Sequence, residues 1–294
     1  MSFGTDLSKE FNKLTNNVML DEVCLFTKLQ DAFINLRSIN PTYQYAIDII
    51  HGHKSYVDFQ FNSTWVSTIP FGQSVKCELA DMMFVIYSKR LNQIRITYMQ
   101  NKKGRTDNKF NADLYQLHLL SQREHITSPK LPDCLFGDPD MLSHAILPSV
   151  GSYGVFYKCN HYVEMSYYPA CLISPSSLTG KSKTRTAEYD KSNYGSTIKI
   201  HTYFECQGTC KIEDFGNALV NMQIGTPILK GTSAHKKLLI FLSHYVADIM
   251  QSSWIEEYTG YPHETNQQPW TPSVPVIYAI NADKIERNND IITD

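Results

Sequence analysis

The feature that most constrains the fold of this chain is a pair of adjacent segments with strand patterns, joined by a short polar turn. Residues 82–87 read Met-Met-Phe-Val-Ile-Tyr, an apolar run typical of a strand that is covered on both faces. Residues 94–100 alternate apolar and polar side chains, as a second strand does. Residues 111–122 then place leucines at helical spacing. The sequence therefore predicts a central β-hairpin followed by a helix.

Further helices and strands are predicted on both sides of this hairpin. Apolar residues at three- and four-residue spacing predict two helices between residue 7 and about residue 36, and another amphipathic helix over 234–250. Strands are predicted at 56–61, 153–157, 162–168, 197–204 and 274–280, and a mobile loop over 174–196. We expect an α/β fold with a mixed central sheet flanked by helices. Residues 1–150 would form the core and 151–294 a strand-rich C-terminal extension packed on it, with a single domain as the alternative.

The composition indicates a folded protein with reduced cysteines, but it does not by itself indicate an activity. The chain has 294 residues, 42% hydrophobic and 19% charged, which is the composition of a folded protein. The formal net charge of -2 provides no overall attraction to nucleic acid, so such binding would need a local basic surface. Seven scattered cysteines without an apolar N-terminal signal indicate reduced thiols in a cytoplasm. A zinc site at Cys206 and Cys210 is less favoured than buried free cysteines.

Polar side chains gather at one end of the predicted hairpin. Glu78 and Asp81 precede the first strand, and Gln100 and Lys102 come at the end of the second. In an antiparallel hairpin the start of one strand lies beside the end of the next, so these residues should meet. Because side chains alternate along a strand, Gln100 and Lys102 should point the same way.

This group has the chemistry of a metal-dependent phosphodiester hydrolase. Mg²⁺ or Mn²⁺ prefers oxygen ligands, which Asp81, Glu78 and the Gln100 carbonyl would supply. Lys102 would orient or help to deprotonate the attacking water, and its charge would offset the negative charge that develops. We therefore expect Glu78, Asp81, Gln100 and Lys102 to be catalytic.

The same residues resemble the PD-(D/E)XK nuclease superfamily. Glu78-Leu79-Ala80-Asp81 before an apolar strand, followed by Gln100-Asn101-Lys102, is similar to the Mrr-like branch, which has glutamine in place of the second acid. The resemblance covers about residues 21–122. It departs from the family pattern next to Asp81, where the usual glycine is absent.

The resemblance implies a restriction-endonuclease-like fold and cleavage of DNA in prokaryotic defence, such as restriction or an anti-phage system. It also implies an additional acid on an early helix, for which Glu22 is the candidate, and a substrate contact from Gln116. Lys103 and Arg105 are then expected to contact backbone phosphates. A homo-oligomer or a defence-system partner subunit would allow both strands to be cut.

Three alternatives remain open at the level of sequence. Glu78 and Asp81 could be ordinary polar residues ahead of a strand, with residues 100–103 a solvated turn. The chain could be a non-catalytic binding module on a nuclease fold. It could also cleave RNA on the same scaffold.

Overall fold

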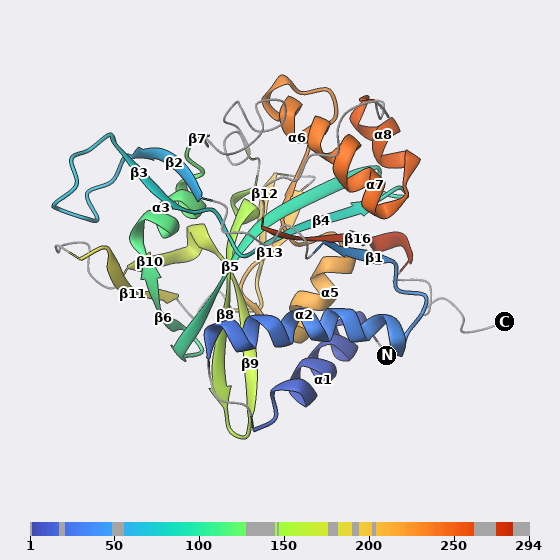
Figure 1. Cartoon of the computed structure of the whole chain (residues 1–294), viewed down its shortest axis with the longest axis horizontal. Helices are drawn as coiled ribbons and strands as arrows, with labels where there is room; N and C mark the ends of the chain where they lie inside the picture. The colour runs from blue at the N-terminus through green and yellow to red at the C-terminus, as the bar shows by residue number, and fades with distance from the viewer. Residues whose placement is uncertain are drawn as a thin grey trace.

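The computed structural model describes residues 2–17, 21–48, 56–127, 145, 147–175, 182–189, 194–201, 204–261 and 275–284 (Figure 1). The fold is α/β, with a large mixed sheet flanked by helices. The helices are α1 (Phe3–Thr15), α2 (Glu22–Ile39), α3 (Leu114–Gln122), α5 (Ile212–Val220), α6 (Lys236–Phe241), α7 (Ala247–Met250) and α8 (Ser253–Thr259). Each of these helices is too short or too polar to traverse a lipid bilayer, a finding that applies to the described ranges only.

The strands run from one end of the chain to the other. They are β1 (Tyr45–Asp48), β2 (Tyr56–Phe61), β3 (Gln73–Glu78), β4 (Met82–Ser88), β5 (Gln93–Thr106), β6 (Lys109–Asp113), β7 (Ile126–Thr127), β8 (Gly151–Cys159), β9 (Tyr162–Pro169), β10 (Ile173–Pro175), β11 (Thr184–Tyr189), β12 (Thr197–His201), β13 (Phe204–Gln207), β14 (Cys210–Lys211), β15 (Thr226–Pro227) and β16 (Val276–Asn281).

The centre of the large sheet is the β4–β5 hairpin. The two strands are antiparallel, with Met82 opposite Met99 and Ser88 opposite Gln93. On one side, β16 pairs parallel with β4 and β1 pairs antiparallel with β16. On the other side, β8 pairs parallel with β5 and β9 follows antiparallel. The far end of β5 pairs with β6, which continues through β11 to β10.

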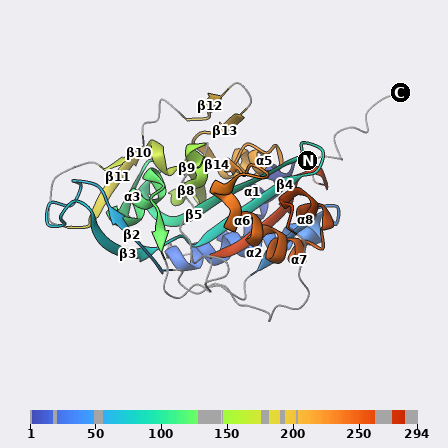
Figure 2. The same ribbon diagram turned by 90° about the horizontal axis from the view of Figure 1, so that it is seen from above.

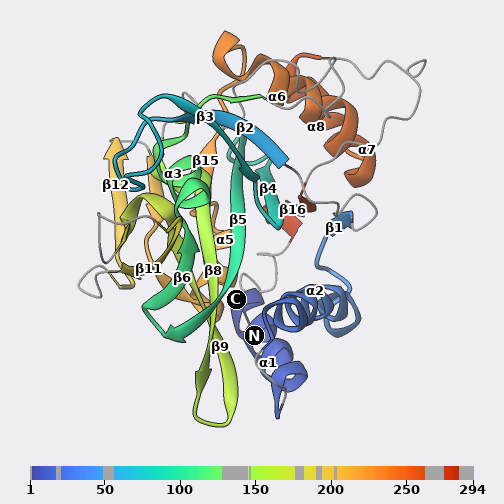
Figure 3. The same ribbon diagram turned by 60° about the vertical axis from the view of Figure 1, so that its left-hand side comes forward.

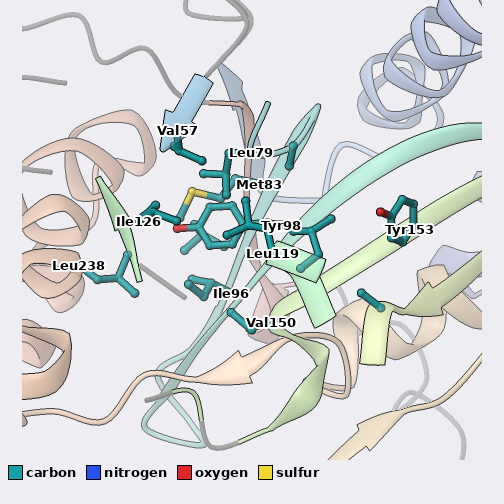
Figure 4. Close-up of a cluster of buried hydrophobic side chains, with 14 of the residues drawn as sticks. Val57, Leu79, Met83, Ile96, Tyr98, Leu119, Ile126, Val150, Tyr153 and Leu238 are labelled. Atoms are coloured by element: carbon teal, nitrogen blue, oxygen red, sulfur yellow. The ribbon is translucent and has the colours of Figure 1, made fainter. Parts of the chain in front are cut away.

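Both faces of this sheet are covered, which explains the apolar run in β4. All seven residues of β4 are buried. One face packs against α1, α2 and α5, and the other packs against α3, the α6–α8 segment and the β2–β3 strands. In Figures 1 and 3, α1 and α2 lie on one side of the sheet and α6, α7 and α8 on the other. Figure 4 shows the Tyr98 ring of β5 among apolar neighbours that include Met83 and Leu119.

A crossover through α3 positions one wall of the candidate site. The chain leaves β6, forms α3 and later returns as β8, which lies parallel to β5. The Asp113 side chain caps α3 by accepting from the Tyr115 N–H at 2.9 Å. At Gly151 an added Cβ would lie 2.2 Å from the Leu120 carbonyl oxygen, so only glycine allows this approach of β8 to α3. Figure 2 shows α3 at the same end of the molecule as β2, β3, β10 and β11.

Most of the predicted elements are confirmed. The two N-terminal helices, the 56–61 strand, the hairpin and the strands near 153, 162 and 276 are all present. The helix predicted over 111–122 is present from Leu114, because residues 109–113 form β6. The 234–250 helix is also present, with a π-helical turn at Leu242–Val246 between α6 and α7. The strand predicted over 197–204 is instead two strands, β12 and β13, which pair with each other.

The second half of the chain contributes more to the central sheet than its composition indicates. The mobile loop predicted over 174–196 is wrong at 184–189, where β11 pairs with β6 and buries Ala187 and Tyr189. The polar composition of this segment indicated a loop, but a strand with only one buried face needs apolar side chains at alternate positions only. In addition, the sheet continues across residue 150, since β8 and β16 pair directly with β5 and β4.

Candidate functional site

A largely buried carboxylate lies at the start of β4 and contacts β5. Asp81 Oδ2 accepts hydrogen bonds from Gln100 Nε2 and from the Asn101 backbone N–H, each at 2.7 Å. The hairpin register explains this contact, because Met82 lies opposite Met99 and the preceding residue therefore falls beside Gln100. Burial raises the pKa of Asp81 above its ordinary value, and the Asn101 N–H and the Lys102 charge partly oppose that increase.

Two hydrogen-bonded carboxamide side chains, Gln100 and Gln116, connect Asp81 to α3. Gln100 and Gln116 are both buried, with 3% and 5% of their surface exposed. Gln116 Nε2 donates to Gln100 Oε1 at 2.6 Å and to the Glu78 backbone carbonyl at 2.9 Å. We call the chain Glu78 carbonyl–Gln116–Gln100–Asp81 the amide relay. It links β3, α3, β5 and the start of β4.

An ion pair adjoins the amide relay along β5. Lys102 Nζ lies 3.2 Å from Glu22 Oε1, and the Lys103 backbone N–H donates to Glu22 Oε2 at 3.1 Å. Glu22 is the first residue of α2, which begins there because the Asp21 side chain caps it at the Cys24 N–H. The Lys102 side chain is mostly covered, with 18% exposed, whereas 41% of the Glu22 side chain is exposed. The ion pair therefore lies at the edge of the buried group.

The structure brings five of the residues selected from the sequence to the same end of the hairpin, in two separate bonded groups. Asp81, Gln100 and Gln116 are joined by the amide relay, and Lys102 and Glu22 are joined by the ion pair. The Lys102 charge lowers the Asp81 pKa and the Glu22 charge raises it, which couples the two groups electrostatically.

The other selected residues are placed differently. Glu78 is the last residue of β3, and its backbone carbonyl accepts the hydrogen bond from Gln116. The sequence had instead led us to expect a role for its side-chain carboxylate as a metal ligand. Lys103 and Arg105 are exposed on β5. Strand alternation directs the Lys103 side chain away from the face that carries Lys102.

The side chains at this site include oxygen atoms of the kind that hard divalent cations prefer. Mg²⁺ sites in proteins use one or two carboxylates with waters and substrate oxygens, and the carboxylates present here are those of Asp81 and, beside Lys102, Glu22. Gln100 Oε1 is a third oxygen, although it accepts from Gln116 in this structure. Over the described ranges no group of three or more His, Cys, Asp or Glu side chains is arranged to hold a metal ion. Cys206 and Cys210 are buried, and neither forms a disulfide.

One feature of the site was not foreseen from the sequence. The Asn101 backbone N–H holds the Asp81 carboxylate, while its side chain is fully buried on the opposite face. Neither Asn101 Oδ1 nor Nδ2 has a hydrogen-bond partner among the described residues. Gly154 on β8 makes room for this side chain, since a Cβ there would lie 2.8 Å from Asn101 Oδ1. Hairpin register alone would have indicated the backbone contact.

No family model, curated protein or solved structure matches this chain. Any function assigned to the site therefore depends on its own geometry and chemistry.

Proposed function

We propose that this chain is a divalent-metal-dependent endonuclease that cleaves DNA phosphodiester bonds on a restriction-endonuclease-like fold. The observation that carries the proposal is the joint placement of Asp81, Gln100, Lys102 and Glu22 at one end of the β4–β5 hairpin. The surrounding topology supports it, since a helix from the N-terminal half, the hairpin, α3 and a strand parallel to β5 enclose the site.

Each side chain has a distinct task under this proposal. Mg²⁺ or Mn²⁺, when bound, would polarise the scissile phosphate and assist ionisation of water. Asp81 and Gln100 would provide ligand oxygens from adjacent strands. Lys102 has three N–H donors, of which Glu22 engages one at 3.2 Å, so within the part of the chain that the structure describes others remain to orient a water or a phosphate oxygen. The buried position of Asp81 strengthens all these electrostatic interactions.

The biological setting is also a proposal. We infer a cytoplasmic enzyme of prokaryotic defence, such as a restriction or anti-phage system, which acts on DNA as a homo-oligomer or with a partner subunit. One such site cuts one strand, so cleavage of both strands would require two sites in an assembly. The exposed Lys103 and Arg105 are proposed to contact DNA directly. Gln116 is buried against Gln100 and Glu78, so its proposed contact with substrate requires that DNA displace it from Glu78.

Digestion of supercoiled plasmid tests the proposal directly. Purified protein should convert plasmid to nicked or linear DNA with Mg²⁺ or Mn²⁺ and not with excess chelator. Lys102→Ala should reduce the rate by at least about 100-fold, the scale of losing one positioned acid–base or charge-stabilising group. Lys199→Ala is the matched control, because Lys199 also pairs with a glutamate, Glu205 at 3.0 Å, on a separate two-stranded sheet. Equal cleavage by wild type and Lys102→Ala would refute the assignment.

A binding module without catalysis is the second candidate. It is favoured by the small number of carboxylates gathered at the site over the described ranges and by the direction in which Gln100 presents its NH₂ group. A folded wild-type protein that binds DNA and cuts neither DNA nor RNA with either metal would support this candidate. Parallel digestion of DNA and RNA also separates a deoxyribonuclease from a ribonuclease on the same scaffold.

A further inference from the structure

The amide relay has a direction that follows from its two ends. The Glu78 backbone carbonyl can only accept a hydrogen bond, so Gln116 must present its NH₂ group there, at 2.9 Å. The second hydrogen of the same NH₂ group points to Gln100 at 2.6 Å, so Gln100 must present its carbonyl oxygen to Gln116. This leaves the Gln100 NH₂ group facing Asp81 Oδ2 at 2.7 Å, where a carboxylate is the acceptor.

This direction opposes the use of Gln100 as a metal ligand. A cation shared with Asp81 needs the Gln100 carbonyl oxygen on the Asp81 side. If Gln100 alone rotated, its NH₂ group would meet the Gln116 NH₂ group, two donors at hydrogen-bond distance. If Gln116 rotated with it, its own carbonyl would meet the Glu78 carbonyl, two acceptors. Since both glutamines are buried, water cannot readily replace the lost partners.

We propose that Gln116 is a positioning residue that holds the Gln100 carbonyl away from Asp81 in the metal-free protein and thereby lowers the affinity of the site for a divalent cation. The inference rests on the proposed metal-dependent function and adds that Gln116 regulates metal binding at the site. Loading of the cation requires the two amides to rotate together, so a DNA contact that displaces Gln116 from Glu78 would favour metal binding.

Two substitutions at Gln116 distinguish an effect of this residue on metal affinity from a purely structural role. Gln116→Met removes the donor that holds the Gln100 carbonyl and adds no charge. Gln116→Glu provides an acceptor in its place, so Gln100 would turn its NH₂ group toward the introduced carboxylate and its carbonyl toward Asp81, and the hydrogen bond to the Glu78 carbonyl would be lost. Gln122→Glu is the matched control, because it adds the same charge to an exposed position on α3 that contacts Ser121 and not Gln100.

The experiment is a titration of the metal-free full chain with Mn²⁺, read by the electron paramagnetic resonance signal of the free ion. We expect Gln116→Met and Gln116→Glu to lower the dissociation constant by about fivefold or more, a coupling of the size common between interacting sites. Gln122→Glu should stay within about twofold of wild type, and Asp81→Ala should abolish the site. If Gln116→Met is unfolded by circular dichroism, Gln116→Glu measured against Gln122→Glu provides the same comparison.

Two different results overturn the inference and are distinguishable. Asp81-dependent binding in wild type with equal or weaker binding in the Gln116 variants refutes the proposed role of Gln116 and leaves the metal-dependent function standing. If neither wild type nor either Gln116 variant binds Mn²⁺ at an Asp81-dependent site, both the metal-dependent function and the proposed role of Gln116 are refuted.

Discussion

Removal of the Asp81 charge should make the metal-free protein more stable. Asp81→Asn retains the shape of the side chain, and the asparagine carbonyl oxygen can accept from Gln100 Nε2 and the Asn101 N–H as Oδ2 does now. The substitution eliminates a buried negative charge whose pKa is raised mainly by that burial. It also eliminates an attraction to Lys102, but Lys102 keeps its pairing with Glu22. The burial effect is the larger of the two.

The sign and the pH dependence of this gain follow from the direction of the pKa shift. Because the folded-state pKa of Asp81 is raised above that of the unfolded chain, protonated Asp81 contributes stability below the unfolded pKa near 3.8. That contribution is lost as the pH rises through the folded pKa. Asp81→Asn should therefore be more stable than wild type at pH 7, by about 1 kcal/mol, the scale of a single stabilising substitution. The corresponding rise in melting temperature is about 2 °C.

Thermal unfolding in chelator, followed by circular dichroism at pH 4, 5.5 and 7, measures this effect. The advantage of Asp81→Asn over wild type should be largest at pH 7 and should shrink toward pH 4. Asp31→Asn is the matched control, since that carboxylate is solvated on α2 and pairs with Lys28 at 3.2 Å. Its effect should stay within about 0.5 kcal/mol. Destabilisation by Asp81→Asn at pH 7, or a gain that is independent of pH, would show that burial does not dominate the electrostatics of Asp81.

Two further predictions concern the scaffold around the site. Gly151→Ala should destabilise the protein by about 3 kcal/mol, because its Cβ would lie 2.2 Å from the rigid Leu120 carbonyl oxygen, and an unchanged urea midpoint would contradict this close approach. His118, buried beside Glu124 at 2.9 Å, has its pKa lowered mainly by burial, so it contributes stability above its unfolded pKa near 6.5 that is lost as the pH falls. The free energy of unfolding of His118→Phe should therefore fall less steeply than that of wild type between pH 7 and 5, by up to about 1.4 kcal/mol per pH unit. An equal slope in the two proteins would contradict a lowered pKa of His118 in the folded state.

Local patterns predicted the centre of the fold well. The apolar run of β4 and the alternation of β5 reflect burial on both faces and pairing in register, and both are properties of short segments. Register in turn predicted that Asp81 and Gln100 would meet, because a hairpin turn ties the two strands together. The same reasoning failed for β11, whose strand character depends on pairing with the distant β6.

The sequence by itself therefore determined the hairpin and the group of Asp81, Gln100 and Lys102 at its end, because strand geometry positions residues that a single turn joins. Only the tertiary structure decided that Gln116 would orient Gln100 and that Glu22 would pair with Lys102. Those contacts depend on how α3 and α2 pack against the sheet. Helix packing is set by side chains from the whole core, so no local pattern specifies which polar atoms it brings into contact.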